Sequence, residues 1–216
     1  MKKYLFTIIQ ILLLNSIVLA TAQIPDKLIY EGESYKLFTN PLESYFKLHP
    51  DKKPETDIQM TSLWRGYVAT FEIKDNKLFV YDIEIQVQKD DDNKPEWKSV
   101  LAEVFPDKDS LYMDWYSGLL VIPRGEMISY VHMGYASEYE EYTIVQISNG
   151  VAEKRKDFLH KEYVEFKERQ FEEFQKTDEY KEIFDRLVKD GSDPEYIKEY
   201  ITNYIIEYTN KFLVDF

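Results

Sequence analysis

The chain has 216 residues, of which 40 are acidic and 27 basic, and its formal net charge at pH 7 is −13. So acidic a surface repels a phosphate backbone, which argues against nucleic acid as a partner. The chain has no cysteine, which excludes disulfides and thiolate metal sites. Its three histidines show no metal-ligand spacing and its seven glycines form no phosphate-binding loop, so we expect no metal and no cofactor.

The first 22 residues have the pattern of a secretory signal peptide. Lys2 and Lys3 precede an apolar run that is shorter than the ~20 residues of a spanning helix, and small residues follow at Ala20-Thr21-Ala22. We expect cleavage after Ala22 and export to the periplasm or the medium; a retained N-terminal anchor is the alternative. No segment of the mature chain is expected to span a membrane.

The spacing of apolar residues divides the mature chain into two parts. Residues 23–157 alternate with a period of two, which is typical of strands, and residues 158–216 follow a helical period. The sequence therefore predicts an α+β fold with an antiparallel β-rich core built from hairpins, followed by a C-terminal helical segment of about three helices. We expect the helical segment to pack on the β-rich domain.

The β-rich part begins with a hairpin and a short helix. Gly32 stands between two strand-like runs, and Asn40 with Pro41 marks a helix start. The charged segment 89–96 reads as a surface loop.

A second hairpin is predicted over residues 64–87. A three-residue loop, Asp75-Asn76-Lys77, collects the apolar side chains on one face, whereas a two-residue loop scatters polar groups over both faces. We therefore expect the pairs Ile73–Phe79, Phe71–Tyr81, Ala69–Ile83 and Tyr67–Ile85.

A third hairpin is predicted with its turn at residues 123–126, which places Ser117 beside His132. Asp114 alternates to the opposite face, so the third member of a nucleophilic triad is missing. We interpret His132 as a hydrogen-bonded structural histidine.

The helical part follows a tight turn predicted at Asn149-Gly150. Gly191 ends the second helix, and Asp193 with Pro194 starts the third. The third helix carries two adjacent apolar rows, which fit packing on the rest of the protein or, alternatively, binding of a partner.

Residues 24–157 resemble a family of uncharacterised bacterial proteins. The segments that carry the resemblance are WRGYVATFEIKDNKLFVYDI and DWYSGLLVIPRGEMISYVHMGYASEYEEY. They match an R-G-Y-x-A-x-aromatic-E-I hairpin and a D-W-[YF]-S-G…Y-V-H-M-G-Y segment. The resemblance implies no activity and assigns no site residue.

Two function classes remain. The missing catalytic motifs favour a non-enzymatic binding or interaction module for an unknown protein or small ligand; the alternative is a hydrolase with an unrecognised carboxylate or histidine site. The expected binding residues are aromatic, Arg and His side chains of the β-rich part: Trp64, Arg65, Trp115, Tyr116, Arg124, His132 and Tyr135.

Overall fold

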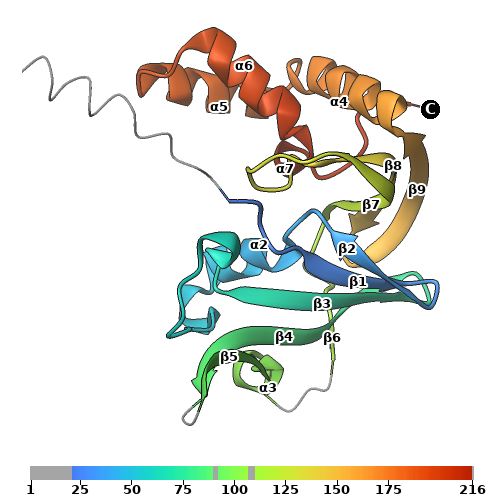
Figure 1. Cartoon of the computed structure of the whole chain (residues 1–216). Coiled ribbons are helices and arrows are strands. Elements are labelled where there is room, and N and C mark those ends of the chain that lie inside the picture. The colour runs from blue at the N-terminus through green and yellow to red at the C-terminus, as the bar shows by residue number, and fades with distance from the viewer. Residues whose placement is uncertain (1–20, 90–91, 107–109, 216) are drawn as a thin grey trace, which may run out of the picture.

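A computed structural model describes residues 21–89, 92–106 and 110–215 of the chain (Figure 1). The predicted signal peptide lies outside the described residues except for Thr21 and Ala22. The strands are β1 Asp26–Tyr30, β2 Glu33–Leu37, β3 Tyr67–Lys74, β4 Lys77–Lys89, β5 Asp92–Ser99, β6 Leu111–Tyr112, β7 Gly118–Ser129, β8 Glu138–Ser148 and β9 Val151–Leu159. The helices are α2 Pro41–Leu48, α3 Leu101–Val104, α4 His160–Phe174, α5 Asp178–Lys189, α6 Pro194–Asn203 and α7 Ile205–Tyr208, with 3-10 turns at Pro50–Lys52 and Thr61–Leu63.

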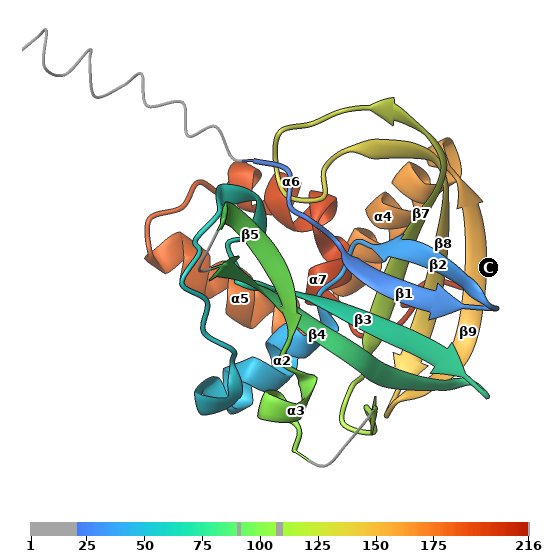
Figure 2. The same cartoon turned by 60° about the horizontal axis from the view of Figure 1, so that its bottom comes forward.

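The predicted α+β fold is confirmed. The strands form one mixed, mostly antiparallel sheet in the order β2-β1-β3-β4-β9-β8-β7, and β5 and β6 also pair with β4. A single pair, Lys77 with Val151, joins β4 to β9, so the sheet folds there into two halves. At the other end Phe38, just after β2, donates its N–H to the carbonyl of Val121 in β7 at 2.8 Å. The sheet therefore curls until β2 lies beside β7 (Figure 2).

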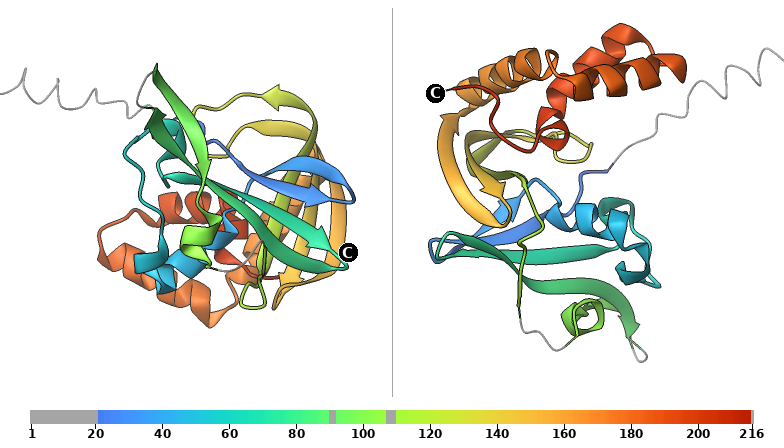
Figure 3. Two further views of the ribbon diagram at one scale, coloured as in Figure 1. Left: turned by 90° about the horizontal axis from the view of Figure 1, so that it is seen from below. Right: turned by 180° about the vertical axis from the view of Figure 1, so that it is seen from behind.

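Strands β7 and β8 separate two apolar cores. Leu120 and Val145 point into the first core, which lies between the two halves of the sheet. Leu119 and Ile144 point the other way into the second core, which the C-terminal helices cover. Figure 3 shows these helices as a layer on the outer face of β7–β9. Because both faces are covered in the first half of β7 and in the second half of β8, residues 118–123 and 142–147 are all buried.

The hairpin over residues 64–87 has the predicted buried face in β3 and at Ile83 and Ile85, but Leu78 and Val80 are buried where Phe79 and Tyr81 were expected, and the loop is different. Tyr67 pairs with Ile85 and Ala69 with Ile83, as expected, whereas Phe71 pairs with Val80. The turn has two residues, Asp75 and Asn76, both with positive φ, and a bulge between Thr70 and Phe71 shifts the register. The predicted three-residue loop and the pairs Ile73–Phe79 and Phe71–Tyr81 are therefore wrong, because the bulge supplies the extra residue.

The predicted turn at residues 123–126 is wrong as well. Strand β7 continues through Pro123 and Arg124 and pairs with β8 over most of its length. Gly125 has the positive φ of +71° that its turn-like sequence suggests, but the residue lies in a bulge. Ser117 accepts a hydrogen bond from the N–H of Asn149 and is not beside His132.

Two other predicted turns are present in the structure, and one predicted loop is not. The turn at Asn149-Gly150 is confirmed, and the first hairpin turns at Glu31-Gly32 with positive φ at both residues. In segment 89–96, Lys89 ends β4 and residues 92–96 belong to β5, so the predicted loop is wrong for these residues; residues 90 and 91 lie outside the described part of the chain.

The helical segment has the predicted order. Helix α4 starts at His160, directly after β9, and α6 starts at Pro194 with the Asp193 carboxylate capping two backbone N–H groups. Ile197 and Ile201 of α6 are buried in the second core. The third predicted helix therefore packs against the rest of the molecule. This was the first interpretation of its apolar rows; the alternative was binding of a partner.

Candidate functional site

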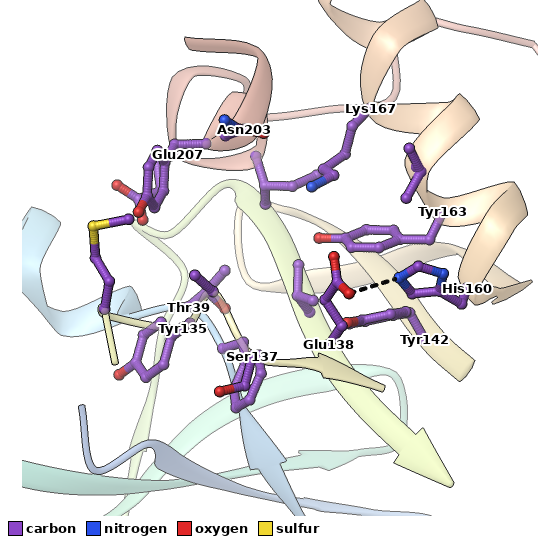
Figure 4. A pocket seen from close by; sticks show the side chains of 17 residues that line it. Thr39, Tyr135, Ser137, Glu138, Tyr142, His160, Tyr163, Lys167, Asn203 and Glu207 are labelled. Atoms are coloured by element: carbon purple, nitrogen blue, oxygen red, sulfur yellow. Dashed lines mark ion pairs between the residues drawn. The ribbon is translucent and has the colours of Figure 1, made fainter. Parts of the chain in front are cut away.

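Two adjoining cavities lie where the end of the curled sheet meets the C-terminal helices. The first has a volume of about 250 Å³ and the second of about 460 Å³, and Thr39, Ile206 and Glu207 line both. Figure 4 shows the first cavity, with Thr39 and Tyr135 on one side and Tyr163 and Lys167 on the other. A cleft between two layers of one fold is a frequent place for a ligand site.

Aromatic rings form much of the wall of the first cavity. Phe38 stacks on Tyr135 with ring centroids 5.0 Å apart, and Tyr142 stacks on Tyr163 at 4.0 Å. Tyr204 also lines the cavity. The first pair joins the β2–α2 connection to the β7–β8 loop, and the second joins β8 to α4. The packing of the sheet and the helices therefore fixes the shape of the wall.

Thr39 lines both cavities and has a buried hydroxyl. The residue lies between β2 and α2 and is only 9% exposed, and its Oγ1 has no hydrogen-bond partner among the described residues. Asn40 next to it does not cap α2 with its side chain, because its Oδ1 accepts from the Tyr135 hydroxyl at 2.9 Å. Native proteins rarely leave a buried hydroxyl unpaired, so this group is a candidate ligand contact.

Lys167 brings a half-buried ammonium to the first cavity. Its Nζ lies 5.2 Å from the centroid of the Tyr163 ring, a cation–π distance, and Figure 4 shows the side chain reaching inward from α4. No carboxylate oxygen of the described residues lies within 4.0 Å of Nζ. Burial lowers the pKa of Lys167, although Glu138 and Glu168 act in the opposite direction.

Three further polar residues line the same cavity. His160 Nε2 lies 3.6 Å from the carboxylate of Glu138. The hydroxyl of Ser137 accepts from the N–H of Val131 at 3.1 Å and is also within reach of the carbonyl of that residue. Glu207 lies at the rim, exposed as a residue, yet neighbouring side chains keep enough water from its carboxyl to raise its pKa.

The second cavity lies beside the exposed ring of Trp64. Trp64 is 81% exposed, whereas Tyr116 in the same wall is buried. Ser117 lines this cavity, and its hydroxyl accepts a hydrogen bond from the N–H of Asn149. This cavity is larger than the first, and its Trp64 side is open to solvent.

The binding residues expected from the sequence are divided among several places. Arg65 is buried and donates to the Tyr135 hydroxyl at 3.0 Å, so these two meet. Tyr135 lines the first cavity, and Trp64 and Tyr116 line the second. Trp115 packs edge-on against Tyr116.

The other two expected residues lie apart from both cavities. Arg124 pairs with Glu141 at 2.7 Å on the sheet. His132 is exposed and lies beside the ring of Tyr130.

Sequence reasoning missed Thr39, Lys167 and Glu207. Thr39 had one available signal, because it stands next to a predicted helix cap. Lys167 and Glu207 had no such signal in the sequence, because a charged residue on an amphipathic helix is ordinarily a solvent-exposed one.

Comparisons of the chain with protein-family models, with curated proteins and with solved structures found no match. The described part of the chain has no helix with the length and apolar character to cross a membrane. It also holds no cluster of three or more side chains suited to bind a metal ion.

Proposed function

We propose that this protein is an exported, non-enzymatic binding protein that holds a small ligand in the first cavity, between the curled sheet and α4, α6 and α7. The observation that carries the proposal is the buried, unpaired hydroxyl of Thr39 in a cavity with aromatic walls. Ligand sites commonly combine apolar walls with a few such polar groups.

The energetics of Thr39 favour a ligand. A buried polar group without a hydrogen bond costs about 1 to 3 kcal/mol, and a ligand that bonds to it recovers part of that cost. A valine at this position has nearly the same shape and no unpaired group. Asp26, Arg65 and Gln86 also have a buried side-chain atom without a partner, but Thr39 is the residue of this group that lines the first cavity, so we assign the ligand contact to Thr39.

A hydrolase is the second candidate, and the pair Glu138–His160 in the cavity is the observation that favours it. Such a pair can activate a nucleophile or a water molecule. The nearest hydroxyl in sequence, Ser137, is buried and bonded to the backbone of Val131, so it is not poised for attack. A hydrolase here needs water as its nucleophile, and the unpaired Thr39 then has no role.

Export follows from the signal-peptide pattern of residues 1–22. Gln23, the residue after the proposed cleavage point, donates its N–H to the carbonyl of Gly134 in the β7–β8 loop at 3.0 Å. Its side chain also donates to the carbonyl of Thr61 at 2.7 Å. The mature chain thus starts at a residue that the fold holds in place.

The proposal is tested with Thr39→Val and a fragment collection of about ten to fifteen non-hydrogen atoms per compound, screened by ligand-observed NMR. We expect a subset of fragments to bind the wild type and to lose affinity in Thr39→Val, while the melting temperature stays the same or rises. Thr202→Val, a half-buried threonine outside the cavity, is the control. If Thr39→Val binds every fragment as the wild type does, the cavity is not the site.

A further inference from the structure

We propose that the ligand of the first cavity is a compact organic monocarboxylate with an apolar body, and that its carboxylate pairs with Nζ of Lys167. This inference rests on the proposed function and specifies the chemistry of the same site. It is carried by the unpaired ammonium, by the size and apolar walls of the cavity and by the Thr39 hydroxyl.

Lys167 is half-buried, whereas five other lysines of the helical layer are exposed: Lys161, Lys176, Lys181, Lys189 and Lys211. Lys161, Lys176 and Lys198 each pair with a glutamate of their own helix or its cap at 2.6 to 3.6 Å. Lys167 instead has an aromatic ring beneath its ammonium and the cavity beside it. A half-buried ammonium is strongly hydrated when free, so removing its water without a counterion is unfavourable.

The acidic groups around the cavity do not supply that counterion. Glu138 attracts Lys167 over a distance but lies in ion-pair contact with His160. Burial raises the pKa of Glu207, and its carboxyl forms no ion pair with Lys167 among the described residues. Burial outweighs the attraction of Glu138 and Glu168, as the lowered pKa of Lys167 shows. An anion that enters the cavity therefore stabilises the charged lysine.

The volume limits the size of the molecule. An apolar cavity of roughly 150 Å³ accepts benzene, so about 250 Å³ accommodates roughly ten non-hydrogen atoms. The ring walls formed by Phe38, Tyr135 and Tyr163 favour an apolar or aromatic body over a second charged group. Thr39 lines the same cavity, and its hydroxyl has no hydrogen-bond partner among the described residues.

The inference is tested by calorimetric titration of the full mature protein with three probes of the same shape: 3-phenylpropionate, 3-phenylpropionamide and 3-phenylpropylamine. We expect the carboxylate to bind at least about tenfold more tightly than the amide, and the ammonium compound to bind most weakly, because a charge-assisted bond is stronger than a neutral one. Lys167→Met should bring the carboxylate to the affinity of the amide. Lys167→Arg should retain most of the preference.

Lys161→Met on the same helix is the matched control, because its side chain is exposed and lies outside the cavity. It should leave all three affinities unchanged. Equal affinities for carboxylate and amide in the wild type, both lost in Thr39→Val, would overturn the inference and leave the binding function standing. Tightest binding of the ammonium compound would overturn it too. Binding of none of the probes would refute this ligand class, and the fragment screen would then decide on the binding function separately.

Discussion

Asp26 and Arg65 form a buried ion pair, with Oδ1 of the aspartate 2.8 Å from Nη2 of the arginine and side-chain exposures of 0% and 4%. The same carboxylate oxygen accepts from the N–H of Ala69 in β3. Arg65 also donates to the Tyr135 hydroxyl, which in turn donates to Asn40. The pair thus connects β1 to a ring that lines the first cavity. One oxygen of Asp26 and Nε of Arg65 have no partner among the described residues.

Breaking this pair should strongly destabilise the fold. Arg65→Met leaves the Asp26 carboxylate buried without its countercharge, so we expect the free energy of unfolding in urea to fall by about 3 to 5 kcal/mol. Lys98→Met removes the exposed ion pair with Glu103 and should change the free energy of unfolding by less than about 1 kcal/mol. Similar small effects of both changes would show that the buried pair contributes little.

The same carboxyl should make stability depend on pH. Burial raises the pKa of Asp26 from 3.8 to about 6, against the lowering effects of Arg65 and of the Ala69 N–H. The folded protein then holds this proton more tightly than the unfolded chain, so the contribution of Asp26 to stability is full below about pH 4 and is lost as the pH rises to about 6.

The measurement compares wild type and Asp26→Asn by urea unfolding at several pH values. The free energy of unfolding of the wild type minus that of the variant should fall between about pH 4 and 6 and then level off. The comparison removes the effect of the other carboxylates, which both proteins share. A difference that grows with pH would mean that Arg65 outweighs burial.

Gly150 should tolerate no side chain. Its φ is +78°, and a Cβ there would lie 2.6 Å from the carbonyl oxygen of Met113 and 2.7 Å from the ring of Tyr112. Gly32 has a similar φ of +83° with open space around it, so Gly32→Ala measures the backbone cost alone, about 1 to 2 kcal/mol. We expect Gly150→Ala to cost clearly more in thermal unfolding; equal costs would show that the neighbouring backbone yields easily.

The third C-terminal helix should contribute to global stability. Ile201 of α6 is fully buried in the second core, so Ile201→Ala should lower the free energy of unfolding by about 2 to 5 kcal/mol. Tyr196 on the same helix is 62% exposed, and Tyr196→Ala should change the free energy of unfolding by roughly 0.5 kcal/mol or less. An unchanged melting temperature in Ile201→Ala would mean that the helix detaches readily and is free for a partner.

The proposed export predicts the N-terminus of the native protein. Cleavage after Ala22 leaves Gln23, as glutamine or in its cyclised form, as the first residue. Mass analysis of the N-terminal peptide from native protein checks this, with Ala22→Arg as a variant that should block cleavage. A native protein that retains Met1 would contradict the proposal.

The sequence by itself determined several local elements of this protein, although not the hairpin loop at residues 75–77 or the turn expected at residues 123–126. Positive-φ turns at Gly32 and Asn149-Gly150 and the start of α6 at Asp193-Pro194 depend on residues a few positions apart, so their chemistry is visible in the sequence. The change from strand to helical periodicity near residue 158 has the same local origin. These signals were sufficient for the fold class and for the order of the helices.

Only the tertiary structure decided the strand pairing and the cavity. The segment around Gly125 has a turn-forming sequence, but pairing of β7 with β8 holds it in a strand with a bulge. The first cavity joins Thr39 to Lys167 and Glu207, which lie far apart along the chain. These residues lie in one cavity because the helical layer packs on the curled sheet, and no spacing of residues within the sequence indicates that packing.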